Sequence, residues 1–130
     1  YRMTSNPRGF CVVVNNKNFN EGTKLEDRDG TEEDVISLQN LFKQLYFTVD
    51  IHNNQTAEEI KSIVKWYKEL DHSNYDCFVL VILSHGSCGN VLGVDGKEVF
   101  INDIFDSFDS IACSSLCGKP KLFFIQACQG

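Results

Sequence analysis

The sequence has no long hydrophobic run and no excess of basic residues, and each absence excludes a class of function. None of its apolar stretches approaches the roughly 20 residues that a membrane-spanning helix needs, so we expect no membrane partner. Its 12 basic and 18 acidic residues give a formal net charge of −6, and its lysines are scattered along the chain. Because a chain of this charge offers no basic surface to a phosphate backbone, no nucleic acid partner is expected.

The sequence also lacks two local signatures. Its first residues do not have the pattern of a secretory signal peptide, and we therefore expect a cytoplasmic protein. No glycine-rich loop opens a helix, as a nucleotide-binding fingerprint requires. A nucleotide-binding domain is thus disfavoured, and no cofactor is expected.

The six cysteines are better explained as free thiols than as three disulfides. Cys11 and Cys77 lie in or beside dense apolar runs, where a free cysteine behaves as a small hydrophobic residue. A reducing cytosol keeps such thiols free. One alternative is a zinc site whose ligands would be His85, Cys88, Cys113 and Cys117. Their spacing lacks the tight pairs of common zinc motifs, so no metal is expected.

Strand-like and helix-like segments alternate along the chain. Four segments have the pattern of strands: residues 10–16, 47–53, 77–84 and 121–127. Helices are predicted by apolar residues that recur every three or four positions, first over 31–46 and then after the capping box that runs from Thr56 to Glu59. Asp95-Gly96 predicts a hairpin turn, and 101–108 a short helix.

The first of these helices is expected to bury one apolar stripe, formed by Val35, Leu38, Leu41, Phe42 and Leu45. The second is expected to bury Ile60, Ile63, Val64, Tyr67 and Leu70. Strands that alternate with helices predict one α/β domain, with a mostly parallel sheet between helices on both faces. The expected fold therefore has three layers, α-β-α.

Two reactive side chains follow strands of this sheet. Folds of this kind place their chemistry outside the carboxyl ends of the strands, and His85 and Cys128 both follow buried strands. A thiol needs a base or a cationic neighbour to form the nucleophilic thiolate, and His85 would supply the base. The backbone N–H groups of Gly86 and Cys128 would then face the developing oxyanion.

Taken singly, neither residue indicates catalysis. A cysteine after an apolar strand is more often a packed core residue than a nucleophile, because buried cysteine is common. A histidine at the end of a strand is usually a polar cap. The combination of both at one rim of the sheet, each followed closely by glycine, favours the catalytic interpretation.

Several segments resemble the caspase family. "FFIQACQG" (123–130) matches the Gln-Ala-Cys-x-Gly signature of caspases, and "ILSHG" (82–86) resembles the family's histidine motif. "DHSNYDCF" (71–78) resembles the approach to that strand. "PRGFCVVVNNKNF" and "DRDGTEEDV" are similar to the first strand and to the loop and helix start after it. These segments follow the expected order and are spread along the chain from residue 7 to residue 130.

The resemblance implies a cysteine endopeptidase that cleaves after aspartate in apoptosis. Residues 1–130 would be the large, catalytic subunit of a caspase, cut from a zymogen. A small subunit from the same precursor would complete the sheet, and two such heterodimers would associate. Protein substrates, adaptors and inhibitors would be its other partners. The segment 121–127 agrees with this expectation, because it would leave an apolar strand at an open sheet edge.

The resemblance also assigns roles to individual residues. Arg28 and Gln126 would line the pocket for the substrate aspartate, and an arginine fork matches both oxygens of a carboxylate. Without the resemblance, Arg28 would be taken for a solvated loop residue paired with Asp27 or Asp29. The backbone carbonyl of Glu26 would orient His85.

Two questions about the type of caspase stay open. "NNKNF", "DRDGT" and the glutamine after the cysteine resemble initiators of the death-receptor branch more than executioners. The alternative function is a catalytically silent caspase-like regulator that acts by heterodimerisation. Retention of both His85 and Cys128 disfavours that alternative.

Overall fold

The computed structural model describes residues 3–129, with the backbone alone at positions 128 and 129. Its elements are β1 (Phe10–Asn15), the 3-10 helix η1 (Glu21–Thr23), α1 (Thr31–Gln44), β2 (Thr48–Asn53), α2 (Ala57–Glu69), β3 (Phe78–Ser87), β4 (Asn90–Leu92), β5 (Glu98–Phe100), α3 (Ile101–Ser107), the 3-10 helix η2 (Ser114–Leu116) and β6 (Lys121–Gln129). The predicted order of strands, helices and hairpin is confirmed. No helix in this described part of the chain has both the length and the apolar character needed to cross a membrane.

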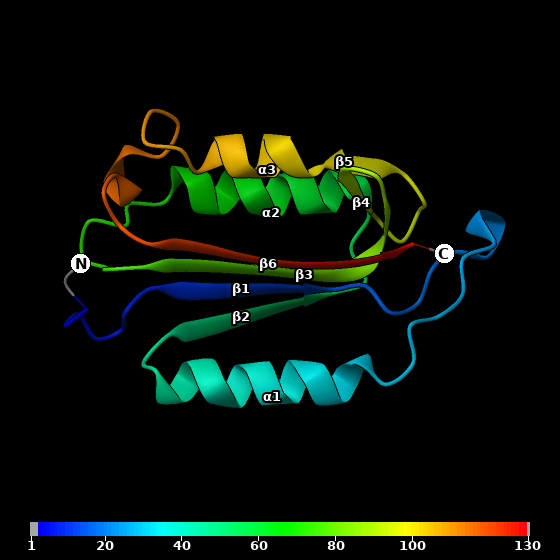
Figure 1. Ribbon diagram of the computed structural model, residues 1–130, viewed down its shortest axis with the longest axis horizontal. Helices are drawn as coiled ribbons and strands as arrows, with labels where there is room; N and C mark the ends of the chain where they lie inside the picture. The colour runs from blue at the N-terminus through cyan, green and yellow to red at the C-terminus, as the bar shows by residue number, and fades with distance from the viewer. Residues whose placement is uncertain (1–2, 130) are drawn as a thin grey trace.

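The sheet is mostly parallel. β1 pairs in parallel with β2 and with β3, and β6 pairs in parallel with β3. The antiparallel pairs are β3 with β4 and β4 with β5, and the second pair is the predicted hairpin around Asp95-Gly96. Figure 1 shows α1 on one face of the sheet and α2 and α3 on the other. The predicted three-layer α-β-α fold is thus confirmed.

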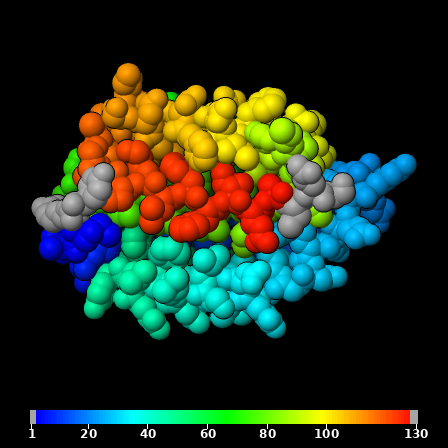
Figure 2. Space-filling view, in the orientation of Figure 1, coloured from blue at the N-terminus to red at the C-terminus, as the bar shows by residue number. Residues whose placement is uncertain are grey.

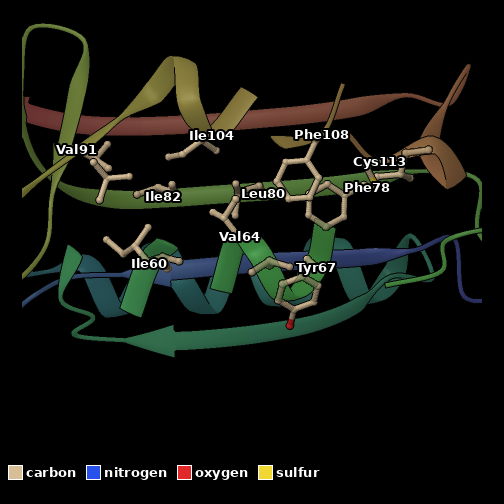
Figure 3. Packing of buried hydrophobic residues seen from close by; sticks show 14 of the residues in the cluster. Ile60, Val64, Tyr67, Phe78, Leu80, Ile82, Val91, Ile104, Phe108 and Cys113 are labelled. Carbon is tan, nitrogen blue, oxygen red and sulfur yellow. The ribbon is translucent and has the colours of Figure 1, made fainter. Parts of the chain in front are cut away.

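A hydrophobic core fills the space on each face of the sheet. Val12 and Val14 belong to the core beneath α2 and α3, whereas Cys11 and Val13 belong to the core against α1. This division follows from the alternation of side chains along a strand. Figure 3 shows the first core, in which residues of β3 pack against residues of α2 and α3. Both central strands are therefore apolar on both faces, as predicted.

The start of α2 is determined locally by its capping box. The Oγ1 of Thr56 accepts a hydrogen bond from the N–H of Glu59 at 3.2 Å, and the N–H of Thr56 donates to Oε1 of Glu59 at 3.0 Å. Ile60, Val64 and Tyr67 are buried on the core side of the helix. The predicted cap is confirmed, and it places α2 at the carboxyl end of β2.

The prediction that α1 buries Leu41 and Leu45 is wrong. Val35 and Phe42 are buried, but Leu41 and Leu45 are 50% and 47% exposed. Leu45 is the C-cap, after which the chain turns through Tyr46 in the left-handed region. Leu41 lines an open groove of about 790 Å³ between α1 and β6. The periodicity identified the helix correctly but did not show that the sheet ends before it covers Leu41.

The strand β6 lies at an edge of the sheet. Among the described residues only β3 pairs with it, and Leu122 and Phe124 are 42% and 50% exposed. Figure 2 shows β6 at the surface between α1 and α3. The predicted apolar edge strand is therefore present, next to the groove that Leu41 lines.

Candidate active site

The carboxyl ends of β3 and β6 bring the two predicted catalytic positions together. His85 and Cys128 are register partners on these neighbouring parallel strands, and Gly86 is the partner of Gln129. Because the strands run in the same direction, both positions lie at one rim of the sheet, as expected. The side chain of Cys128 lies outside the described part of the structure, so its contact with His85 stays a prediction.

The imidazole of His85 is positioned by a ring contact and by a hydrogen bond at Nε2. His85 is 9% exposed, and its ring lies against Phe19 with 4.7 Å between the ring centroids. Its Nε2 is 2.7 Å from the backbone carbonyl oxygen of Glu26. A carbonyl oxygen can only accept, so Nε2 must carry the proton, and Nδ1 of the neutral ring then holds a free lone pair.

The other ring nitrogen of His85 is buried. Nδ1 has no hydrogen-bond partner within the described part of the chain. A buried nitrogen without a partner is costly in a structural histidine, whereas a general base needs an unoccupied lone pair. This geometry suits an imidazole that accepts a proton at Nδ1.

Four of the predicted site residues line one pocket of about 310 Å³, namely Glu26, Arg28, His85 and Gln126. These residues come from the loop after β1, from β3 and from β6. The carboxyl ends of the strands position the last two, and the loop folds back over them through the contact between Glu26 and His85. Gly86 follows His85 in β3 and completes the rim.

Arg28 is oriented by backbone groups. Its N–H donates to the carbonyl oxygen of Lys17 at 2.9 Å, and its Nη1 donates to the carbonyl oxygen of Asn16 at 3.0 Å. Within the described contacts no ion pair joins it to Asp27 or Asp29. A guanidinium has five N–H donors, and this arrangement leaves others available to a carboxylate.

Sequence reasoning missed Asn16, which joins several elements beneath the pocket. This fully buried residue accepts a hydrogen bond at Oδ1 from the N–H of Gln55 at 2.8 Å. Its Nδ2 lies 3.1 Å from the carbonyl oxygen of Leu92 and 3.3 Å from Oγ of Ser84. Asn16 therefore ties β1 to β3, to β4 and to the start of α2, and its carbonyl holds Arg28. In the sequence it looks like any asparagine that follows a strand.

Asn16→Ala is expected to lower the free energy of unfolding by about 2–4 kcal/mol, since it leaves several buried polar groups without partners. Chemical denaturation of the precursor would measure the change. Asn18→Ala is the matched control, because Asn18 is exposed and its hydrogen bonds are near the surface; a loss below about 1 kcal/mol is expected there. Equal losses in the two variants would contradict the role given to Asn16.

Burial excludes two other cysteines as nucleophiles. It raises the pKa of the Cys11 thiol to about 12 and also raises the pKa of Cys77. Neither side chain forms a useful fraction of thiolate at neutral pH. All five cysteines with described side chains are free thiols, as predicted, and Cys88 and Cys117 are the exposed ones. In the described part of the chain no three His, Cys, Asp or Glu side chains are grouped to bind a metal.

Gly86 is enclosed by its neighbours. A Cβ atom at this position would lie 2.5 Å from Cβ of Ala127 and 2.6 Å from the carbonyl oxygen of Asn90. Both distances are shorter than van der Waals contact. A glycine is therefore needed here for the close packing of β3 against β6 and β4 beside His85.

Comparisons with known proteins agree with this arrangement. The family described as "Caspase domain" matches residues 8–130. Over the whole chain, the sequence is 45% identical to caspase-8 of Mus musculus, 47% to caspase-10 of Homo sapiens and 42% to caspase-3 of Mesocricetus auratus. The chain spans 28%, 25% and 47% of the lengths of these relatives, respectively.

This protein belongs to the caspase family, as the match over residues 8–130 shows. The resemblance drawn from the sequence motifs is therefore confirmed. The identities to caspase-8 and caspase-10 support the initiator-like assignment.

Proposed function

We propose that this chain is the large, catalytic subunit of a cysteine endopeptidase that cleaves after aspartate and acts in apoptosis. The observation that carries the proposal is the pocket in which His85 and Arg28 meet beside the carboxyl end of β6. The pocket combines a histidine with a free Nδ1 lone pair and a guanidinium with available donors. An aspartate-directed protease needs both groups.

In the proposed reaction, Nδ1 of His85 takes the proton from the thiol of Cys128, and the thiolate attacks the carbonyl carbon of the scissile bond. The N–H groups of Gly86 and Cys128 stabilise the resulting oxyanion. When the C–N bond breaks, the imidazolium returns the proton to the leaving amine, and a thioester remains.

A water molecule completes the reaction. His85 accepts one of its protons while the oxygen attacks the thioester carbonyl, and the departing thiolate recovers a proton. The hydrogen bond between Nε2 and the carbonyl oxygen of Glu26 keeps the ring in one tautomer through both steps. The carbonyl of Glu26 thus takes the orienting role that a carboxylate has in a Ser-His-Asp triad.

The substrate aspartate would bind Arg28 and Gln126. The pocket also contains acidic side chains, namely Glu26, Asp27, Asp29 and Asp34. Their negative charge opposes the entry of a carboxylate, and Arg28 is the one cationic residue among the described residues of the lining. A second cation from the small subunit would offset this repulsion, as the resemblance implies.

The small subunit would occupy the open edge of the sheet. β6 has an unpaired edge and stands beside an apolar groove to which Leu38, Leu41 and Phe124 contribute. A further strand from the small subunit would satisfy the edge, and its apolar side chains would fill the groove. Two such heterodimers would associate in the cytoplasm after cleavage of the zymogen, and adaptors or inhibitors would regulate them.

The test is the cleavage of paired peptides by the processed precursor, with aspartate or asparagine before the scissile bond. Cleavage after aspartate alone is expected. Arg28→Lys is expected to lower kcat/KM for the aspartyl peptide by about 10-fold to 100-fold, because a point charge does not make the bidentate contact. Lys24→Arg, an exposed exchange of the same two residue types, is the control and should leave kcat/KM unchanged.

Two results would contradict the proposal. Equal kcat/KM in the Arg28→Lys and unaltered proteins would remove Arg28 from the substrate pocket. No cleavage of either peptide by a folded and processed protein that still binds caspase partners would favour the silent regulator instead.

A further inference from the structure

A second groove lies at the opposite edge of the sheet from β6. It has a volume of about 580 Å³ and runs between β2 and α2. Its lining consists of Val49, Asp50, Ile51, His52, Ser62, Ile63, Trp66 and Tyr67. Because β1 and β3 separate β2 from β6, this groove shares no lining residue with the pocket around His85. The proposed peptidase does not use it.

The outer main chain of β2 is open within the described part of the protein. β1 is its one partner there. The N–H of Thr48 donates to the carbonyl oxygen of Gly9, and the N–H of Asn54 donates to that of Asn15, so alternate residues of β2 point toward β1. The peptide groups of Val49 and Ile51 therefore face outward. An extended segment would pair with them as an added strand.

A carboxylate and an exposed aromatic ring line this groove together, and Tyr67 contacts both. The hydroxyl of Tyr67 donates to Oδ2 of Asp50, and Figure 3 shows the ring of Tyr67 reaching from α2 toward β2. Trp66 is 58% exposed and packs edge-on against Tyr67, with 4.9 Å between the ring centroids. A carboxylate beside an indole is a favourable environment for an ammonium or guanidinium group.

Two further observations favour a polar, cationic ligand. His52 contributes a second polar side chain to the lining, and its buried Nε2 has no hydrogen-bond partner among the described residues. No lysine or arginine is among the described residues that line this groove. Lysines of α2 instead line a separate pocket between α2 and α3. Asp50 thus has no neutralising partner here, and the chain's net charge of −6 adds a general attraction for cations.

We propose that this groove binds an extended segment of a partner protein, which adds a strand to β2 and places a lysine or arginine side chain between Asp50 and Trp66. Asp50 and His52 lie on the same face of β2, two positions apart. The segment therefore alternates basic residues, which face α2, with apolar residues, which face α1. This site lies outside the proposed peptidase function and stands even if that proposal fails.

The test is titration calorimetry of the precursor with a short peptide in which lysine alternates with valine. A second peptide has glutamine in place of lysine. Binding of the lysine peptide and at least tenfold weaker binding of the glutamine peptide are expected. Asp50→Asn keeps an acceptor for Tyr67 but removes the charge, and it should lower the affinity for the lysine peptide about fivefold. Trp66→Ala, at an exposed position, should lower the affinity for the same peptide about tenfold.

Asp106→Asn is the matched control, because Asp106 is an exposed aspartate on α3 outside this groove. Unchanged affinity in this variant, with the losses above, supports the proposal. Equal binding of the two peptides, no binding, or unchanged affinity in both Asp50→Asn and Trp66→Ala would overturn it. Equally tight binding of butylamine alone would assign the groove to a small cation and also overturn it. Thermal unfolding of each variant identifies a loss of affinity that is due to misfolding.

Discussion

Cys128→Ala in the precursor is expected to lower kcat/KM for an aspartyl peptide by about 10⁴-fold or more, with no large change in stability. His85→Ala should lower it by about 10³-fold or more, because the thiol then loses the base that ionises it. The kcat/KM of the double variant should be only slightly lower than that of Cys128→Ala alone. Residues that act as one catalytic unit fail together, since removing the second member removes nothing that still functions.

The control for this pair is Cys88→Ala. Cys88 is an exposed thiol three residues after His85, and its replacement should leave kcat/KM unchanged. Normal turnover in either single catalytic variant would overturn the mechanism. A double variant whose loss equals the product of the two single losses would show that the residues act independently, and it would remove His85 as the base of Cys128.

Gly86→Ala is expected to lower the free energy of unfolding by about 3 kcal/mol, since overpacking of a tight contact costs this amount. The added Cβ would lie 2.5 Å from Cβ of Ala127 and 2.6 Å from the carbonyl oxygen of Asn90, so β3 must move away from its neighbours. His85 is the preceding residue and would shift with the strand. A displacement of this kind is expected to lower kcat/KM by about 100-fold in the protein that remains folded.

Gly22→Ala is the matched control, because a Cβ placed there would meet no atom within 4 Å outside the neighbouring residues of the chain. Chemical denaturation and peptide cleavage, measured at a temperature where both variants are folded, would separate the two effects. Unchanged stability in Gly86→Ala would show that β3 and β6 are less tightly packed than in this structure. Lower stability with normal kcat/KM would show that the position of His85 does not depend on this contact.

The fold was largely predictable from local pattern. The apolar runs of β1 and β3 are buried on both faces, and a strand of this composition has few other ways to avoid water. The capping box of Thr56 and Glu59 forms within a few residues of the chain, so no distant contact was needed to locate the start of α2. Leu41 shows the limit of this reasoning. Periodicity places it on the apolar face of α1, but the width of the sheet decides whether anything covers it.

The candidate site, like the fold, was predictable in part from local sequence patterns. The residue types and motifs were enough to nominate the candidates: a histidine and a cysteine after buried strands, with an arginine in the loop of a caspase-like motif. Register then made His85 and Cys128 neighbours because parallel strands align their carboxyl ends.

How these residues are held depends on contacts between segments that are distant in the chain. The carbonyl oxygen of Glu26 fixes the tautomer of His85, and that of Asn16 orients Arg28. Every residue has such a carbonyl, so residue type alone does not show which ones are used. The role of Glu26 was expected only from the caspase resemblance, and that of Asn16 was not expected. The groove beside Asp50 and Trp66 likewise exists because α2 and β2, two separate segments, lie side by side and line it together. Composition and spacing along the chain specify chemical groups, whereas the packing of distant segments determines which groups meet.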